Sequence, residues 1–302
     1  MTKMPFTQKV MFSVSFGVVL ILNVLGNCTV FIIILKKQVM RTPMNYLLLH
    51  LALADLLVGL TAIPNNAIVP FFSHPQGMAG NLFCKIFASD NLTYICGQVS
   101  ALILIVIASE RYKAVVIPHK VKKKVTNAKI FACVFLCWIV SIGIFVPWLY
   151  WAKLNTKTGQ CDLGKPPLFA IHIYRYVNIL VFVVPMLSMA VYYGLVVRQL
   201  VKSENRNVDR KLHARKKTRT RITWMLVTVA IVYVICWCPV TVFFTTTNEG
   251  NEHILYKIFT LLVVFNSSVN AFIYTLFSKK FRKGVRNIFR FSSKRPNNTV
   301  RY

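Results

Sequence analysis

Long apolar runs alternate with short basic segments along the whole chain. A helix needs about 20 mostly apolar residues to cross the hydrocarbon core of a bilayer, and seven runs reach that length. These predicted spans cover about residues 10–35, 45–70, 82–112, 127–151, 172–200, 220–247 and 253–277. The first run is too long for the apolar core of a signal peptide and lacks a small-residue cleavage site, so we expect a retained span. The pattern predicts an all-α membrane protein, a seven-transmembrane helix bundle.

The segments outside the bundle differ in character. Residues 1–9 form a short N-terminal segment before the bundle, which takes residues 10–277. Residues 278–291 alternate apolar and basic side chains at helical spacing, which predicts a short amphipathic eighth helix on the membrane surface. We expect a disordered tail over residues 292–302.

The distribution of lysine and arginine predicts the orientation of the bundle. If the N-terminus is extracellular, the segments that face the cytoplasm hold 27 of the 37 Lys and Arg residues, and the opposite side holds 8. Basic residues concentrate on the cytoplasmic side of multi-pass membrane proteins. We therefore expect an extracellular N-terminus.

Composition and charge exclude a soluble protein and a nucleic-acid binder. Charged residues make up 15% of the chain, whereas a soluble domain carries about 25%. The net charge of +29 comes from basic blocks between apolar runs, such as Lys122 to Lys124, so we expect no nucleic-acid partner. Most of the 8 cysteines lie inside apolar runs and lack the spacing of a zinc site. We expect membrane lipid as a partner.

Polar side chains interrupt several of the spans. An ionisable or amide side chain in hydrocarbon costs several kcal/mol, so each such residue marks a candidate site. The candidates are Asn27 in the first span, Asp55 in the second, Ser100 in the third, and Asn266, Ser267 and Asn270 in the seventh. These side chains can all converge on one water-filled polar core.

An ordered set of short motifs resembles the signature of the rhodopsin-like (class A) G-protein-coupled receptors. The motifs are Gly26-Asn27, the run from Leu51 to Leu57, Glu110-Arg111-Tyr112, Trp138, Pro185 with Tyr193, Cys236-Trp237-Cys238-Pro239 and Asn266 to Tyr274. They follow the family's order over about residues 20–290. The resemblance implies a plasma-membrane receptor rather than an enzyme, with a heterotrimeric G protein as its intracellular partner.

The resemblance also assigns a metal site and a disulfide. The family's sodium-binding cluster corresponds to Asp55, Ser100, Asn266 and Ser267. A buried carboxylate beside hydroxyls and amides suits a hard cation, but it can also take up a proton or only tie helices together. We expect no cofactor apart from such an allosteric sodium ion. The family's disulfide corresponds to Cys84, at the top of the third span, and Cys161, in the second outer loop.

Residues expected to couple to the G protein follow from the same resemblance. They are Glu110, Arg111, Tyr112, Tyr193, Pro239, Asn270 and Tyr274. The family pattern implies that Arg111 leaves Glu110 and contacts Tyr193 and Tyr274 in the active state. The alternative is an arginine whose side chain only extends to the lipid headgroups. Pro239 removes a backbone hydrogen bond and kinks the sixth span, which allows its inner end to move outward.

The sequence departs from the family pattern at four places. Ala271 replaces the usual proline of the seventh span, which removes its usual kink. Cys84 and Arg111 lie 27 residues apart, about two more than usual; a long tilted helix can hold them, but the register of its outer part stays open. Arg219 stands where many members carry an acid, so we expect elevated ligand-independent signalling. The tail after Phe281 has no cysteine, so basic residues alone must hold it to anionic lipid.

The sequence restricts the ligand without naming it. Thr93 replaces the aspartate of amine receptors, and the nearest acid lies one turn further out. Val264 replaces the lysine that binds retinal, and the N-terminal segment is too short for a binding ectodomain. We therefore expect a small molecule or short peptide within the bundle. The expected lining residues are Asp90, Thr93, Tyr94, Thr241, Phe244 and Thr260, with Trp237 at the floor, although any one of them can be an ordinary packing residue.

Other classes of membrane protein fit less well. A transporter would show repeated halves with broken helices in matching places, and the sequence has no such repeat. An intramembrane enzyme or a channel needs a catalytic dyad or a pore ring, and the sequence of the spans offers neither. The ligand, the G-protein subtype and the oligomeric state stay open.

Overall fold

Seven long helices form the body of the molecule. The computed structural model describes residues 5–72, 75–88, 90–118, 125–155, 160–163, 167–204, 210–246 and 253–292. Its helices are α1 (Phe6–Lys36), α2 (Pro43–Ile63), α3 (Gly77–Phe83), α4 (Asn91–Val115), α5 (Asn127–Trp151), α6 (Leu168–Glu204), α7 (Arg210–Thr246), α8 (His253–Phe277) and α9 (Lys279–Ser292). Within the described residues, seven helical segments are long and apolar enough to cross a membrane. The predicted seven-helix bundle is therefore confirmed.

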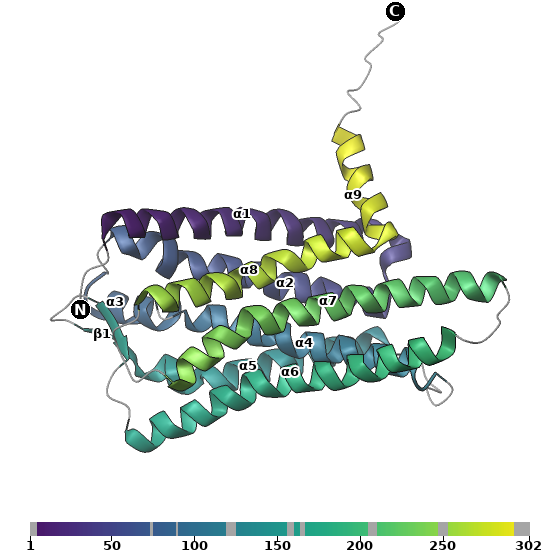
Figure 1. Cartoon of the computed structure of the whole chain (residues 1–302). Coiled ribbons are helices and arrows are strands. Elements are labelled where there is room, and N and C mark those ends of the chain that lie inside the picture. The colour runs from purple at the N-terminus through teal and green to yellow at the C-terminus, as the bar shows by residue number, and fades with distance from the viewer. Residues whose placement is uncertain are drawn as a thin grey trace, which may run out of the picture.

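The long helices lie side by side, and α9 leaves the bundle at one end (Figure 1). We call the end where α1 begins the outer end and the end where α9 leaves the inner end. α1 begins at Phe6, a few residues before the predicted start of the first span. The predicted tail beyond Ser292 and the side chain of Arg219 lie outside the described residues.

The second span changes helix type near its outer end. Thr42 caps the start of α2 by accepting a hydrogen bond from the Asn45 backbone N–H (3.3 Å), and Pro43 occupies the first turn, where no N–H is needed. At the other end, α2 passes into a π-helical segment, Pro64–Ile68. Pro64 has no N–H to donate to the regular α-helical pattern, so the wider turn begins at a residue that cannot continue that pattern.

The third span is not one continuous α-helix. α3 passes into a π-helical segment, Cys84–Ala88, and α4 begins only after Asp90, whose φ of 52° is left-handed. The long tilted helix suggested by the spacing of Cys84 and Arg111 is therefore wrong for its outer part. A π turn holds more residues than an α turn, and the break adds length without adding helix, so the two together accommodate the additional residues.

A two-stranded hairpin covers part of the outer end. Strand β1 (Ala152–Asn155) pairs antiparallel with β2 (Gln160–Leu163). A disulfide joins Cys161 of β2 to Cys84, so the predicted pairing is confirmed. The Leu154 backbone N–H also donates to Asn81 Oδ1 on α3 (2.9 Å). The hairpin is thus fixed to the start of the third span by both a covalent and a polar contact.

Close backbone approach joins α1 to α8 and to α9. A Cβ added at Gly26 would lie 2.9 Å from the Cβ of Ala271, so the alanine of the variant motif packs directly on a glycine of α1. A Cβ at Gly284 of α9 would meet Ile33 at 2.8 Å. Phe281 is buried on the same side of α9, while Lys279, Lys280, Arg282, Lys283 and Arg286 are exposed. This helix has the amphipathic arrangement that the sequence predicts.

Candidate functional site

A buried carboxylate near the middle of the bundle joins three helices. Asp55 of α2 has no solvent-exposed surface. Its Oδ1 accepts a hydrogen bond from Ser100 Oγ of α4 (2.8 Å), and its Oδ2 accepts one from Asn270 Nδ2 of α8 (2.8 Å). The Ser267 hydroxyl lies near the same carboxylate. We call these four residues the Asp55 cluster.

Helix α1 adds two amides beside the Asp55 cluster. Asn23 Nδ2 donates to the Asp55 backbone carbonyl (2.9 Å), and Asn27 Nδ2 donates to the Ser267 carbonyl (3.1 Å). The side chain of Asn266 is buried on α8 next in sequence to Ser267. The structure therefore brings Asp55, Ser100, Ser267 and Asn270 together, and the predicted polar core draws on four helices.

The oxygen atoms of the Asp55 cluster suit a hard cation. Ser267 Oγ and Asn270 Oδ1 of this cluster, and Oδ1 of Asn266 next to it in the sequence, are buried and have no hydrogen-bond partner among the described residues. Hard cations bind carboxylate, hydroxyl and amide oxygens. No Lys, Arg or His of the described residues lies within ion-pair distance of Asp55. The residues present thus fit the sodium ion that the sequence predicts, and that ion remains a prediction.

A series of polar side chains leads from the Asp55 cluster toward the inner end. The Tyr274 hydroxyl of α8 interacts electrostatically with both Asp55 and Tyr193 of α6. Tyr193 in turn interacts electrostatically with Arg111 of α4. Both tyrosine hydroxyls are buried and have no hydrogen-bond partner among the described residues. The structure therefore places the predicted switch tyrosines between the two predicted charged centres.

The neighbours of Arg111 have contacts of their own. Glu110 forms an ion pair with Lys113, one turn further along α4 (2.7 Å). Tyr112 packs against Tyr192 of α6, with ring centroids 5.7 Å apart. Pro239 lies within α7, and the ribbon of that helix bends toward its outer end (Figure 1). The coupling roles expected for these residues stay predictions.

An aromatic layer lies around Trp237 of α7. The indole is 1% exposed, stacks on Tyr233 (5.5 Å between ring centroids) and packs against Phe182 of α6 (5.0 Å). Gly97 of α4 makes room for it, because a Cβ there would lie 2.5 Å from Trp237 Cη2. Any larger residue at position 97 would force the indole to move.

Several predicted ligand-lining residues meet above this layer. Tyr94 packs edge-on against Trp237 (6.3 Å) and Phe244 (5.7 Å), and its hydroxyl shares a hydrogen bond with Thr260 Oγ1 (3.2 Å). Thr241 Oγ1 instead donates to the Trp237 backbone carbonyl (2.9 Å). The structure thus groups three of the predicted residues, Trp237, Phe244 and Thr260, around Tyr94, while Thr241 hydrogen-bonds to its own helix.

Thr93 faces α2 rather than Trp237. Its hydroxyl shares a hydrogen bond with Thr61 Oγ1 (3.1 Å), and the residue has no solvent-exposed surface. This contact links α4 to α2 at the position where amine receptors carry their aspartate. The ligand-binding role expected for Thr93 stays a prediction.

A second buried carboxylate lies near the outer end. Asp90 is 1% exposed and accepts hydrogen bonds from Asn65 Nδ2 (2.6 Å), Asn66 Nδ2 (2.8 Å) and the Tyr256 hydroxyl (2.7 Å). Lys257 Nζ donates to Asn66 Oδ1 (2.8 Å) and to the Asn65 carbonyl (3.2 Å). We call these five residues the Asp90 cluster. It joins the second, third and seventh spans.

The charges of the Asp90 cluster compensate one another through an amide. Lys257 and Asp90 attract each other electrostatically, but no direct ion pair between them occurs within the described residues. Asn66 instead donates to the carboxylate and accepts from the ammonium group. A carboxylate has about four acceptor sites, and three are used here. A ligand that bonds to Asp90 must take the last site or displace a donor.

The partners of Asp90 are not apparent from the sequence. Asn65 and Asn66 follow Pro64 in the π-helical segment, and Tyr256 and Lys257 lie in the first turn of the last span. A lysine inside an apolar span is a signal that could have pointed to a buried partner. Nothing local in the sequence connects it to Asp90.

Comparison with known proteins agrees with this geometry. The sequence model of the family described as "7 transmembrane receptor (rhodopsin family)" matches residues 26–274. The Tachykinin-like peptides receptor 86C of Drosophila melanogaster is 27% identical, over 93% of this chain and 58% of that receptor. Neuromedin-U receptor 2 of Mus musculus is 28% identical, over 91% of this chain and 74% of that receptor. Galanin receptor 2a of Danio rerio is 25% identical, over 93% of this chain and 78% of that receptor.

Proposed function

Because the chain belongs to the rhodopsin family of seven-transmembrane receptors, we propose that it binds an extracellular peptide within the bundle and activates a heterotrimeric G protein. Membership of this family makes the chain a multi-pass membrane receptor and not an enzyme. The observation that supports the rest is the series of polar side chains Asp55, Tyr274, Tyr193 and Arg111, each close enough to the next to interact electrostatically. Such a series can link a change in the middle of the bundle to its inner end.

The names of the receptors of similar sequence favour a peptide ligand over other small molecules. Three receptors of similar sequence are named for tachykinin-like peptides, neuromedin U and galanin. The aromatic and hydroxyl groups around Tyr94 offer apolar surface together with a few fixed polar contacts, which is the usual character of a ligand site inside a protein.

Activation is proposed to move the inner part of α7 outward. Pro239 interrupts the hydrogen bonding of that helix, and the indole of Trp237 packs two residues before it. A ligand that displaces Tyr94 or Trp237 would change the packing at this hinge. Arg111 would then contact the G protein at the cavity that the movement opens.

A sodium ion is proposed to stabilise the receptor in its resting state. Asp55, Ser100, Ser267 and Asn266 would supply the oxygen ligands. The support is that Asp55 has no cationic side chain within ion-pair distance among the described residues, whereas buried oxygens nearby have no partner there. A buried carboxylate without such compensation must be protonated or bind a cation.

The proposed orientation puts the outer end outside the cell, with the receptor in the plasma membrane. The excess of basic residues on the loops of the inner end supports it. α9 presents exposed Lys279, Lys280, Arg282, Lys283 and Arg286, which would attract anionic lipid of the inner leaflet.

The experiment that tests this function measures G-protein activation in cells that express the chain. Peptides would be screened by energy transfer between Gα and Gβγ reporters, and the ligand-independent signal would be compared with that of empty vector. We expect one peptide class to activate a G protein and Arg111→Ala to abolish activation while peptide binding persists. Robust peptide binding at the surface with no response from any Gα class would contradict the proposal.

A further inference from the structure

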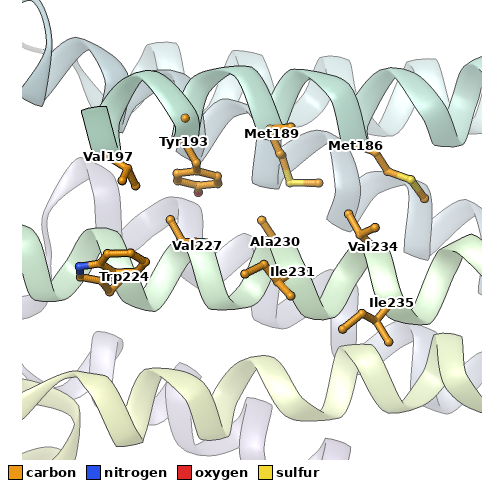
Figure 2. Close-up of a pocket in the computed structure, with 12 residues that line it drawn as sticks. Met186, Met189, Tyr193, Val197, Trp224, Val227, Ala230, Ile231, Val234 and Ile235 are labelled. Atoms are coloured by element: carbon orange, nitrogen blue, oxygen red, sulfur yellow. The ribbon is translucent and has the colours of Figure 1, made fainter. Parts of the chain in front are cut away.

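The middle of α7 borders a groove instead of packing fully against α6. The groove has a volume of about 470 Å³. Figure 2 shows Met189 and Tyr193 of α6 on one side of it and Trp224, Val227 and Ala230 of α7 on the other. The groove removes part of the contact that α6 would otherwise make with α7. The position of the inner end of α7 therefore depends more on its other neighbours.

On another side, α7 packs against α8 (Figure 1). Arg221 lies three positions before Trp224, just beyond the inner end of the groove. Its Nη2 donates a hydrogen bond to the Leu276 carbonyl, near the end of α8 (3.4 Å). Arg282 of α9 donates to the same carbonyl through Nη1 (3.2 Å). Two guanidinium groups from different helices thus meet at one backbone oxygen.

The Leu276 carbonyl is a suitable acceptor for cationic side chains. α8 ends at Phe277, and the last carbonyls of an α-helix have no N–H partner within that helix. These carbonyls also form the negative end of the helix dipole, where a basic side chain is stabilised. A carbonyl oxygen has two lone pairs, so it can accept from both arginines at once.

The two arginines differ in what they connect. Arg282 lies in the first turn of α9, directly after α8, so its hydrogen bond stays within the corner between these two helices. Arg221 belongs to α7 and lies 55 positions before Leu276, so its hydrogen bond joins two spans. If α7 moves away from α8, only the bond from Arg221 must break. Arg282 then still satisfies the carbonyl, so the movement leaves no acceptor without a donor.

α7 has no acidic side chain with which to bind the arginine of the third span. No Asp or Glu occurs anywhere in its sequence, Arg210–Thr246. An ion pair between α7 and Arg111 therefore cannot form, and Glu110 pairs with Lys113 of its own helix. The contact that Arg221 makes has the opposite polarity, because α7 supplies the cation and α8 supplies the negative end of a helix.

We propose that Arg221 is a latch that holds the inner end of α7 to the carboxyl end of α8 in the resting receptor. The proposal rests on the proposed function, in which the inner part of α7 moves outward. That movement takes Arg221 away from the Leu276 carbonyl, so the hydrogen bond stabilises the resting arrangement alone. One exposed hydrogen bond holds α7 only weakly, which is compatible with the elevated ligand-independent signalling expected from Arg219.

The test measures the position of α7 in the full chain, purified without ligand and reconstituted in phosphatidylcholine nanodiscs. Spin labels would be attached at Lys129→Cys, near the inner end of α5, and at Trp224→Cys of α7, in a background without other reactive cysteines. Both positions are exposed. Pulsed electron resonance then gives the distribution of distances between the labels. Arg221→Met should raise the population with the longer distance about threefold, which corresponds to ~0.7 kcal/mol.

Arg282→Met is the matched control. It removes the same charge and a hydrogen bond to the same carbonyl, but it leaves α7 attached to α8. The longer distance should therefore stay as rare as in the wild type. If Arg221→Met fails to fold, as judged by gel filtration and circular dichroism, Arg221→Ala takes its place.

A second readout separates the latch from the proposed function. Ligand-independent G-protein activation in cells should rise about threefold with Arg221→Met and stay unchanged with Arg282→Met. A longer distance between the labels without any change in this signal would support the latch and contradict the proposed function.

Two results would overturn the latch. The first is an unchanged distribution of distances in folded Arg221→Met, which would make Arg221 an ordinary interfacial arginine. The second is an equal increase of the longer distance in Arg282→Met, which would attribute the change to the lost charge and not to the bond between α7 and α8. Neither result depends on whether the receptor signals.

Discussion

Two aspartates, Asp55 and Asp90, are buried to the same extent but meet opposite surroundings. Asp55 lies among groups that include several acceptor oxygens without partners, and the described residues place no cationic side chain within ion-pair distance of it. Asp90 lies among three donors, and the ammonium group of Lys257 is nearby. The outer carboxylate is therefore compensated by the protein itself, whereas the inner one requires a proton or a cation from outside.

The two clusters also differ in backbone. Asp55, Ser100 and Asn270 lie within regular α-helices. Asp90 has a left-handed φ between a π-helical segment and α4, and its amide partners come from a second π-helical segment. A cluster built on irregular turns can bring donors from adjacent positions, such as Asn65 and Asn66, onto one carboxylate. We infer that the Asp90 cluster mainly fixes structure and the Asp55 cluster mainly responds to ions.

Removing the lysine of the Asp90 cluster should have the largest effect. Lys257→Met leaves the Asp90 carboxylate without a compensating charge and should destabilise the receptor by about 2–4 kcal/mol. Thermal unfolding of the purified receptor measures this loss of stability. The double variant Lys257→Met with Asp90→Asn should recover much of the loss, because asparagine is neutral and tolerates left-handed φ. Lys153→Met, at an exposed position of β1, is the control. An unchanged unfolding temperature for Lys257→Met would show that Asp90 is not charged.

Disturbing the layer between the two clusters should have the next largest effect. Gly97→Ala places a methyl group against the Trp237 indole, and such overpacking costs about 1–3 kcal/mol. We also expect ligand-independent signalling to change, because the indole must move. Gly143→Ala, which meets open space, should keep wild-type signalling. If both variants behaved alike in the unfolding and signalling assays, Trp237 would not be tightly held by α4.

The response to sodium should distinguish the two aspartates. Replacing choline chloride with sodium chloride should stabilise the wild-type receptor by about 1–3 kcal/mol at saturating salt, because the ion binds only the folded state. Asp55→Asn should remove this response, whereas the variant with both Lys257→Met and Asp90→Asn should retain it. The measurement is the unfolding temperature in each salt at constant ionic strength. Equal sodium responses in wild type and Asp55→Asn would contradict a sodium site at Asp55.

Removing the Tyr94 hydroxyl from the aromatic layer should have the smallest effect. Tyr94→Phe removes the bond to Thr260 but keeps the ring contacts, so we expect a loss of about 0.5–1.5 kcal/mol in stability. The same change should weaken peptide binding more than stability if Tyr94 lines the ligand site. Saturation binding measures the loss of peptide affinity, and thermal unfolding of the same preparation measures the loss of stability. Unchanged affinity would make Tyr94 a packing residue.

Much of the Asp55 cluster could be predicted because it depends on regular helices. In a regular helix the position of Ser100 or Asn270 follows from counting residues along the axis, so motifs in fixed order indicate which side chains meet. The Cys84–Cys161 disulfide was predicted for another reason, because the family resemblance assigns a disulfide to these two positions. The Asp90 partners were not predicted. A π-helical segment and the left-handed Asp90 shift the side chains of the third span around its axis, and the pattern of apolar residues does not encode the size of that shift.

The sequence by itself determined that the chain crosses the membrane seven times and which polar residues lie inside the spans. The physical reason is that lipid cannot hydrogen-bond the backbone, so long apolar helices are required and each polar interruption stands out. Only the tertiary structure decided which donors surround Asp90 and that α6 and α7 leave a groove between them. These features depend on how helices far apart in the sequence pack and where small residues meet, and no local pattern carries that information.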